Sequence, residues 1–130
     1  MTPPERVAAG LLALESVALF VVAGWETVAL VGGDSDDTGT SIALIVLTVI
    51  GAVAVAAFAV GTARGASWGR SGGIVAQLLM LAVALGALTG PAPALGFALL
   101  VAAPAIVGLV VLFAAARRAA ARRPSSSPPE

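Results

Sequence analysis

Residues 41–63, with the sequence SIALIVLTVIGAVAVAAFAVGTA, form an apolar stretch that contains no charged side chain. A helix needs about 20 such residues to cross the hydrocarbon core of a bilayer. Three more stretches of similar character occupy residues 7–31, 71–89 and 94–116. The sequence therefore predicts an all-α membrane protein, with four transmembrane helices in an antiparallel up-down bundle over residues 1–116.

The overall composition supports this fold class. The chain is 59% hydrophobic and 11% charged, with a mean hydropathy of +1.05. Soluble domains average about 45–50% apolar and about 25% charged residues. A soluble fold of this composition would leave too much apolar surface in contact with water. Four spans and their short loops use nearly all of the 130 residues, so we expect no soluble domain among them.

The positive charges predict an orientation in the membrane. All seven basic residues are arginines, and each lies beside or between apolar stretches on what would be one side of the bilayer: Arg6, Arg64, Arg70, Arg117, Arg118, Arg122 and Arg123. The loop after the first stretch carries Asp34, Asp36 and Asp37 and no base. Because Lys and Arg collect in cytoplasmic loops, we expect a multi-pass protein of the inner (plasma) membrane with both termini in the cytoplasm.

Two arginine-rich segments are expected at the membrane surface. The loop 64–70 holds a tryptophan between two arginines, which suits the headgroup region. The candidate topology and lipid-headgroup residues are Arg64, Trp68, Arg70, Arg117 and Arg118. Residues 117–130 begin as a basic helical end and finish as a Pro/Ser-rich segment, for which we expect a disordered cytoplasmic tail.

Missing residue types exclude several kinds of chemistry. The chain has no Cys and no His, which removes disulfides, thiol redox chemistry and the usual ligands of haem, copper and zinc. No nucleophile–base pair is evident, and the formal net charge is zero. We therefore expect no enzyme activity, no cofactor, no metal and no nucleic-acid partner.

Two segments allow a competing interpretation. The first stretch follows a base, as in a signal peptide, but Glu15 interrupts it and no clean cleavage site follows. The acidic loop 34–37 resembles part of a calcium loop, but the remaining acidic ligand is missing at the required spacing. We interpret the first as a membrane span and the second as a solvated loop, with a helix cap at Thr40 or Ser41.

Glu15 is the candidate site within the membrane. It lies about 12 Å into the first span, where a charged side chain is costly and marks a functional hypothesis. Glu26, eleven residues further on, falls on nearly the same helix face. Gln77 lies at a similar depth in the third span and could hydrogen-bond to Glu15. The pair, with Ser16, is either a polar clasp between the first and third helices or a proton or cation site.

Small residues predict where helices touch. Ala57 and Gly61 lie four residues apart in the second span, and Ala82, Gly86 and Gly90 repeat at the same spacing in the third. Small residues at this spacing allow close backbone approach in lipid. We expect both stripes to face another helix, within the bundle or across a dimer.

The layout resembles the small uncharacterised four-helix integral membrane proteins of actinobacteria, most visibly at Trp68-Gly69-Arg70 and the following Gln77-Leu78-Leu79. That family implies no established activity. A weaker resemblance, through Gly10-Leu11-Leu12-Ala13-Leu14-Glu15, is to the small multidrug resistance transporters, which have a membrane-embedded glutamate in helix one. The chain lacks the aromatic cluster that would hold a lipophilic cation.

Two hypotheses follow from these features. The first is a structural or accessory membrane component whose partners are the lipid bilayer and either another membrane protein or further copies of the same chain. The second is a small proton-coupled transporter or channel that uses Glu15.

Overall fold

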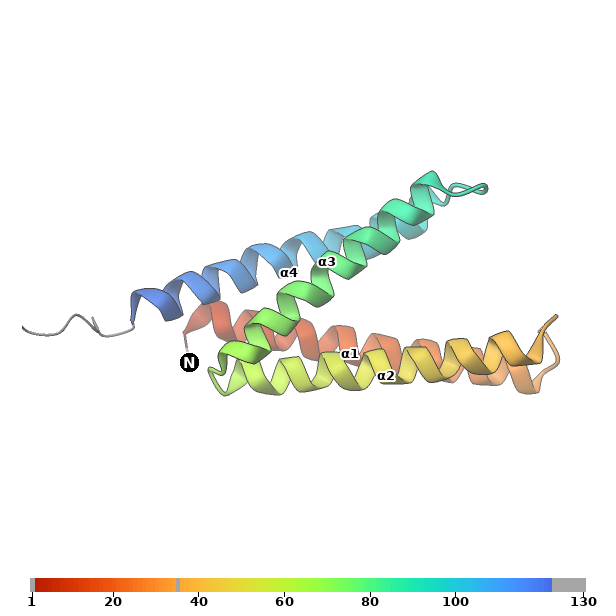
Figure 1. Ribbon diagram of the computed structural model, residues 1–130, viewed down its shortest axis with the longest axis horizontal. Coiled ribbons are helices and arrows are strands. Elements are labelled where there is room, and N and C mark those ends of the chain that lie inside the picture. The colour runs from red at the N-terminus through yellow and green to blue at the C-terminus, as the bar shows by residue number, and fades with distance from the viewer. Residues whose placement is uncertain (1, 35, 123–130) are drawn as a thin grey trace, which may run out of the picture.

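The computed structural model describes residues 2–34 and 36–122 and contains four helices over these residues. They are α1 (Pro3–Val31), α2 (Thr38–Ala63), α3 (Ser67–Thr89) and α4 (Leu95–Ala121) (Figure 1). Each helix is long and apolar enough to cross a membrane. The predicted all-α class with four candidate membrane spans is therefore confirmed.

The helices extend beyond the apolar stretches that revealed them. α1, α2 and α3 each begin three or four residues before the expected span, and α4 continues to Ala121 rather than residue 116. A helix can continue into the headgroup region, because its backbone hydrogen bonds do not depend on apolar side chains. Part of the predicted tail is thus helical, whereas residues 123–130 lie outside the described residues.

Asp37 starts α2, which corrects the expected cap at Thr40 or Ser41. Its carboxylate accepts hydrogen bonds from the Thr40 hydroxyl and from the Gly39 amide N–H, at 3.0 Å for the latter. The Thr40 hydroxyl, together with the backbone N–H groups of Thr40 and Gly39, holds the pKa of Asp37 below its usual value. The acidic loop therefore has a structural use, because Asp37 pairs with N–H groups that the first turn leaves free.

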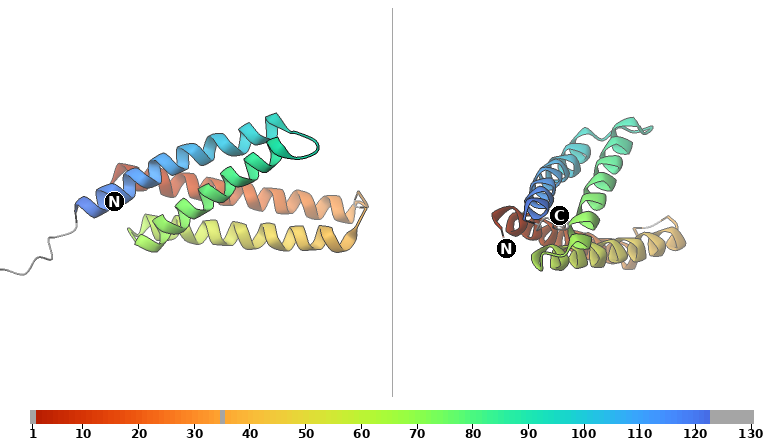
Figure 2. Two further views of the ribbon diagram at one scale, coloured as in Figure 1. Left: turned by 45° about the horizontal axis from the view of Figure 1, so that its top comes forward. Right: turned by 60° about the vertical axis from the view of Figure 1, so that its left-hand side comes forward.

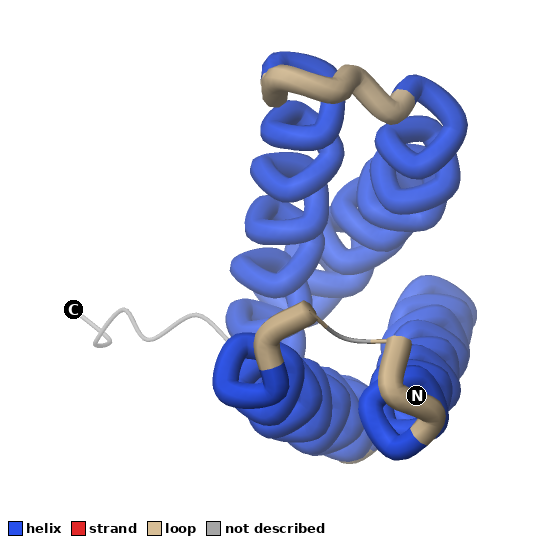
Figure 3. Tube along the Cα trace, turned by 90° about the vertical axis from the view of Figure 1, so that its right-hand side faces the viewer, coloured by secondary structure: helices blue, strands red, loops and turns tan. Residues whose placement is uncertain are grey.

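The four helices are arranged as two hairpins that form a V (Figures 1 and 2). α1 packs extensively along α2, and α3 along α4. The hairpins meet where α1 begins, α2 turns into α3 and α4 ends, and we call this region the arginine end. They separate toward the other end, the acidic end, where the 32–37 and 90–94 loops lie well apart (Figure 3). The expected antiparallel up-down bundle is therefore not confirmed.

Glycines make the junction of the V possible. A Cβ added to Gly69 of α3 would lie 2.4 Å from the backbone nitrogen of Thr62 and 2.8 Å from the Cα of Gly61 in α2. A Cβ on Gly73 would lie 3.1 Å from side-chain carbons of both Leu12 in α1 and Leu112 in α4. Close backbone approach through glycine is the usual packing mode of helices in lipid, and here it joins the two hairpins.

A cluster of buried apolar side chains from α1, α2 and α4 lies in the same half of the molecule. Its buried members are Ala8, Leu12, Val55, Ala59 and Leu112. Many large apolar side chains elsewhere on all four helices are exposed. In a membrane protein such side chains can contact lipid, so their exposure does not require a further protein layer.

The two predicted small-residue stripes pack differently from each other. Gly61 is buried against Gly69 and the Trp68 ring, as expected, but Ala57 is exposed. Ala82 and Gly86 are also exposed, and a Cβ on Gly86 would meet nothing within 4 Å. Ala82 and Gly86 therefore do not face another helix within the described part of the chain, and the expected contact across a dimer stays a prediction.

Candidate functional site

Glu15 of α1 and Gln77 of α3 lie in direct contact across the two hairpins. The Gln77 Nε2 donates a hydrogen bond of 2.7 Å to the Glu15 Oε2. Glu15 is 8% exposed and Gln77 is fully buried. The structure thus brings together the two residues that the sequence suggested as a pair, and the pair connects the two hairpins directly.

The other two helices complete the surroundings of this pair. Ser16, beside Glu15, donates a 2.8 Å hydrogen bond to the carbonyl oxygen of Ala52 in α2. The hydroxyl therefore ties α1 to α2, not to α3 as expected. In α4, a Cβ on Gly108 would lie 2.7 Å from the Gln77 Cδ, so the glycine provides the space that the amide occupies. Sequence reasoning missed Gly108, which has no small partner four residues away.

The second side-chain oxygen of each residue in the pair is also buried. The Glu15 Oε1 and the Gln77 Oε1 are buried and have no hydrogen-bond partner within the described part of the chain. No arginine among residues 2–34 and 36–122 forms an ion pair with Glu15. A buried polar pair of this kind fastens helices, at about 1 kcal/mol. Glu15 is almost fully buried and Gln77 packs closely against Gly108, which favours the clasp over an open pathway for ions.

Glu26 lies apart from this clasp. Its Oε1 accepts a hydrogen bond of 3.3 Å from the Thr48 hydroxyl of α2. The side chain borders an open pocket at the acidic end, together with Trp25, Leu44 and the three aspartates of the 32–37 loop. No three acidic side chains in the described ranges are placed to hold a metal ion. Glu26 shares a helix face with Glu15 but belongs to a different site.

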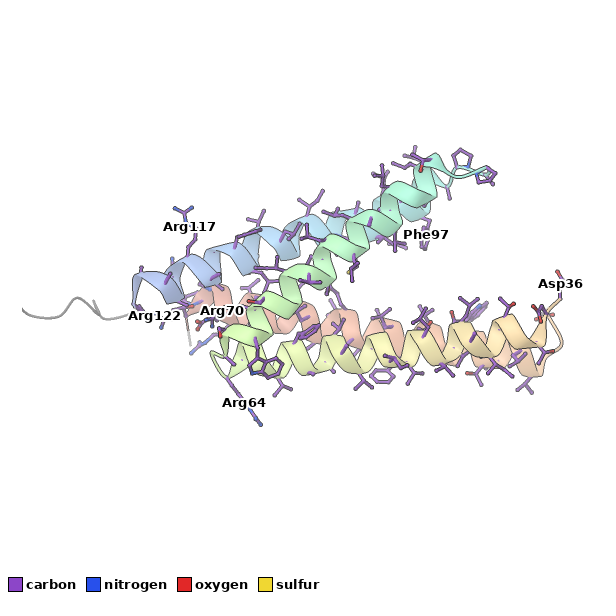
Figure 4. All side chains as sticks on the ribbon, in the orientation of Figure 1. Asp36, Arg64, Arg70, Phe97, Arg117 and Arg122 are labelled. Carbon is purple, nitrogen blue, oxygen red and sulfur yellow. The ribbon has the colours of Figure 1, made fainter. Side chains whose placement is uncertain are left out.

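A charged cluster at the arginine end was not foreseen. Glu5 of α1, Arg70 of α3 and Arg122, which follows the last residue of α4, lie together, with Arg70 and Arg122 labelled in Figure 4. The Arg122 Nη2 lies 2.9 Å from the Glu5 Oε1, and the Arg70 Nη1 lies 3.8 Å from the same oxygen. Glu5 precedes the first apolar stretch, so the sequence offered no reason to separate it from an ordinary polar lead.

Arg70 therefore differs from the other predicted headgroup residues. Its guanidinium is buried and donates a 2.8 Å hydrogen bond to the carbonyl oxygen of Gly65. The interpretation of Arg70 as a headgroup contact is wrong, since its donors are directed into the protein. Arg64, Arg117, Arg118 and Trp68 are exposed, and the first two point away from the helices in Figure 4. These four positions are free to meet lipid headgroups.

Comparison with known proteins adds no further information about function. No known protein family, curated protein or solved structure matches this chain. The function must therefore be argued from the geometry described above.

Proposed function

We propose that the protein is a non-enzymatic structural or accessory component of the cell membrane, which associates with other copies of itself through the exposed face of α3. The observation that carries this proposal is the separation of the hairpins toward the acidic end. It moves the half of α3 near the acidic end away from α1 and α2, and that half presents Ala82 and Gly86 at its surface.

A small-residue helix face has a different value against lipid tails and against a second helix. Lipid tails gain nothing special from glycine, whereas a second helix gains close backbone contact over a small-residue face. A Cβ on Gly86 would be unobstructed within the chain. The glycine is thus not needed for the fold of one copy, and a second membrane helix is the partner that would use it.

Replacing Gly86 with leucine tests this association. We expect Gly86→Leu to keep the fold of one copy, because space is available, and to abolish self-association in lipid bilayers. Subunit counting by single-molecule photobleaching in liposomes measures the association. Gly24→Leu is the matched control, since Gly24 of α1 is also an open helical glycine. Self-association that persists in Gly86→Leu, or that disappears equally in Gly24→Leu, would contradict the proposal.

The transport hypothesis has less support from the geometry. A carboxyl group that exchanges protons across a membrane needs access to water from at least one side. Glu15 is almost fully buried against Gln77. The pair is better suited to hold the hairpins together, which is the accessory type of role that we propose.

We further propose that the arginine end faces the cytoplasm. Arginines gather at that end and aspartates at the other, and Lys and Arg collect on the cytoplasmic side of membranes. Single cysteines at Asp36 and Ser67, both exposed, test it in a chain that has no native cysteine. A thiol reagent that does not cross membranes should label Asp36→Cys in intact cells and Ser67→Cys only after lysis. The opposite labelling would reverse the orientation.

A further inference from the structure

The charged cluster at the arginine end joins three helices through one carboxylate. Besides its contacts to Arg122 and Arg70, the Glu5 carboxylate accepts a 2.9 Å hydrogen bond from the backbone N–H of Thr2 through Oε2. The contact between Glu5 and Arg122 connects α1 with α4, the least extensive of the major helix–helix contacts in the molecule. The cluster is therefore placed to control how firmly the end of α4 is attached to α1.

The two arginines of the cluster differ sharply in their access to the outside. The Glu5 and Arg70 side chains are 4% and 8% exposed, whereas the Arg122 side chain is 55% exposed. Arg70 is also held by the carbonyl oxygen of Gly65. Arg70 thus belongs to the interior, and Arg122 can be reached from the membrane surface.

Loss of Arg122 would not leave Glu5 without partners. The carboxylate would keep the Thr2 N–H and the Arg70 guanidinium. Stranding a buried charge is strongly destabilising, and this cost is avoided here because Arg70 stays in place. The contact can therefore open and close with little penalty to the fold.

Arg122 is also surrounded by positive charge. Arg117 and Arg118 are exposed in the preceding turns of α4, and Arg118 lies four residues before Arg122, on the same helix face. Such a group attracts anionic lipid headgroups to the membrane surface around it. A guanidinium also matches the oxygens of a phosphate group, to which it can donate two parallel hydrogen bonds.

We propose that Arg122 is a binding site for the phosphate of an anionic lipid headgroup, and that this phosphate competes with Glu5 for the guanidinium. In a neutral bilayer Arg122 stays on Glu5 and fastens α4 to α1. In an anionic bilayer it turns to the headgroup, and the last turn of α4 moves away from α1. This exchange does not require self-association, and it can take place in whichever leaflet contains the arginine end.

Distances between spin labels test the proposal in lipid nanodiscs. One pair of labels at Val7 and Ala120, both exposed, spans α1 and α4. A second pair at Val7 and Ala63 lies within the α1–α2 hairpin and is the internal control. We expect the first distance to lengthen and broaden when phosphatidylcholine is replaced by phosphatidylglycerol, with the second unchanged. An unchanged first distance overturns the proposal.

Substitutions separate this exchange from a general effect of surface charge. Glu5→Gln and Arg122→Gln should both show the longer α1–α4 distance in either lipid, with no further response to phosphatidylglycerol. Arg64→Gln removes an equal charge from the exposed α2–α3 loop, outside the arginine group of α4, and should keep the response. If Glu5→Gln does not fold, Arg122→Gln is sufficient to test the proposal, because the Arg122 side chain is about half exposed and its loss leaves the interior unchanged. A lipid response that survives in Arg122→Gln overturns the proposal.

Inorganic phosphate distinguishes the two sources of the ligand. Added to phosphatidylcholine nanodiscs, it should leave the Val7–Ala120 distance unchanged, because a free ion lacks the high local concentration of a charged bilayer surface. Lengthening by inorganic phosphate to the same extent as by phosphatidylglycerol would overturn the assignment to a lipid headgroup.

Discussion

Gly69→Ala is expected to destabilise the protein by about 3 kcal/mol or more. Adding a methyl group to a well-packed contact typically costs about 1–3 kcal/mol, and here the methyl group would collide with backbone atoms of α2. The added Cβ would lie 2.4 Å from the Thr62 nitrogen and 2.5 Å from the Gly61 carbonyl carbon. Neither atom can rotate away, so α2 and α3 must separate at the junction of the hairpins. Thermal unfolding in a mild detergent, followed by circular dichroism, measures the loss.

Gly10→Ala is the control for Gly69→Ala, and the two variants are expected to change the melting temperature in opposite directions. Gly10→Ala adds the same methyl group to α1, where nothing lies within 4 Å. Alanine exceeds glycine in helix propensity by about 1 kcal/mol, so the control should melt at or above the parent temperature. If Gly69→Ala also melts at or above that temperature, α2 and α3 do not approach as closely as described.

Glu15→Lys is expected to cause the second large effect, a loss of a few kcal/mol in stability, which is the cost of a charge near the bilayer centre. The lysine would replace a carboxylate that is 8% exposed and would face the fully buried Gln77, whose Nε2 donates to Glu15 in the parent. Glu15→Gln should fold like the parent, since glutamine keeps the size of the side chain and an oxygen that can accept from the Gln77 Nε2. The same unfolding measurement compares the three proteins.

Two outcomes would change the interpretation of Glu15. Equal melting of all three proteins would mean that the side chain faces water and that the clasp with Gln77 does not form. Proton uptake into liposomes that is present with the parent and absent with Glu15→Gln would favour the transport hypothesis over the structural one. A clasp predicts no proton uptake with either protein.

Part of the candidate site could be predicted from residue type and depth. Glu15 and Gln77 are the strongly polar side chains in the interiors of their spans, and each lies at a similar distance from the arginine end, so a hydrogen bond between them was a reasonable expectation. Gly108 and the cluster of Glu5 with Arg122 could not be predicted. One is a single glycine without a pattern, and the other joins residues 117 positions apart in the chain.

The sequence by itself determined the number of helices and their approximate limits, because a bilayer demands about 20 consecutive apolar residues and each segment carries that information internally. Only the tertiary structure decided which faces meet. In water, hydrophobicity marks the buried side of a helix, but in lipid an apolar side chain is equally stable against a tail or a neighbouring helix. Gly69 and Gly86 are both glycines of α3, yet one lies against the backbone of α2 and the other is open, because the hairpins meet at one end and separate toward the other.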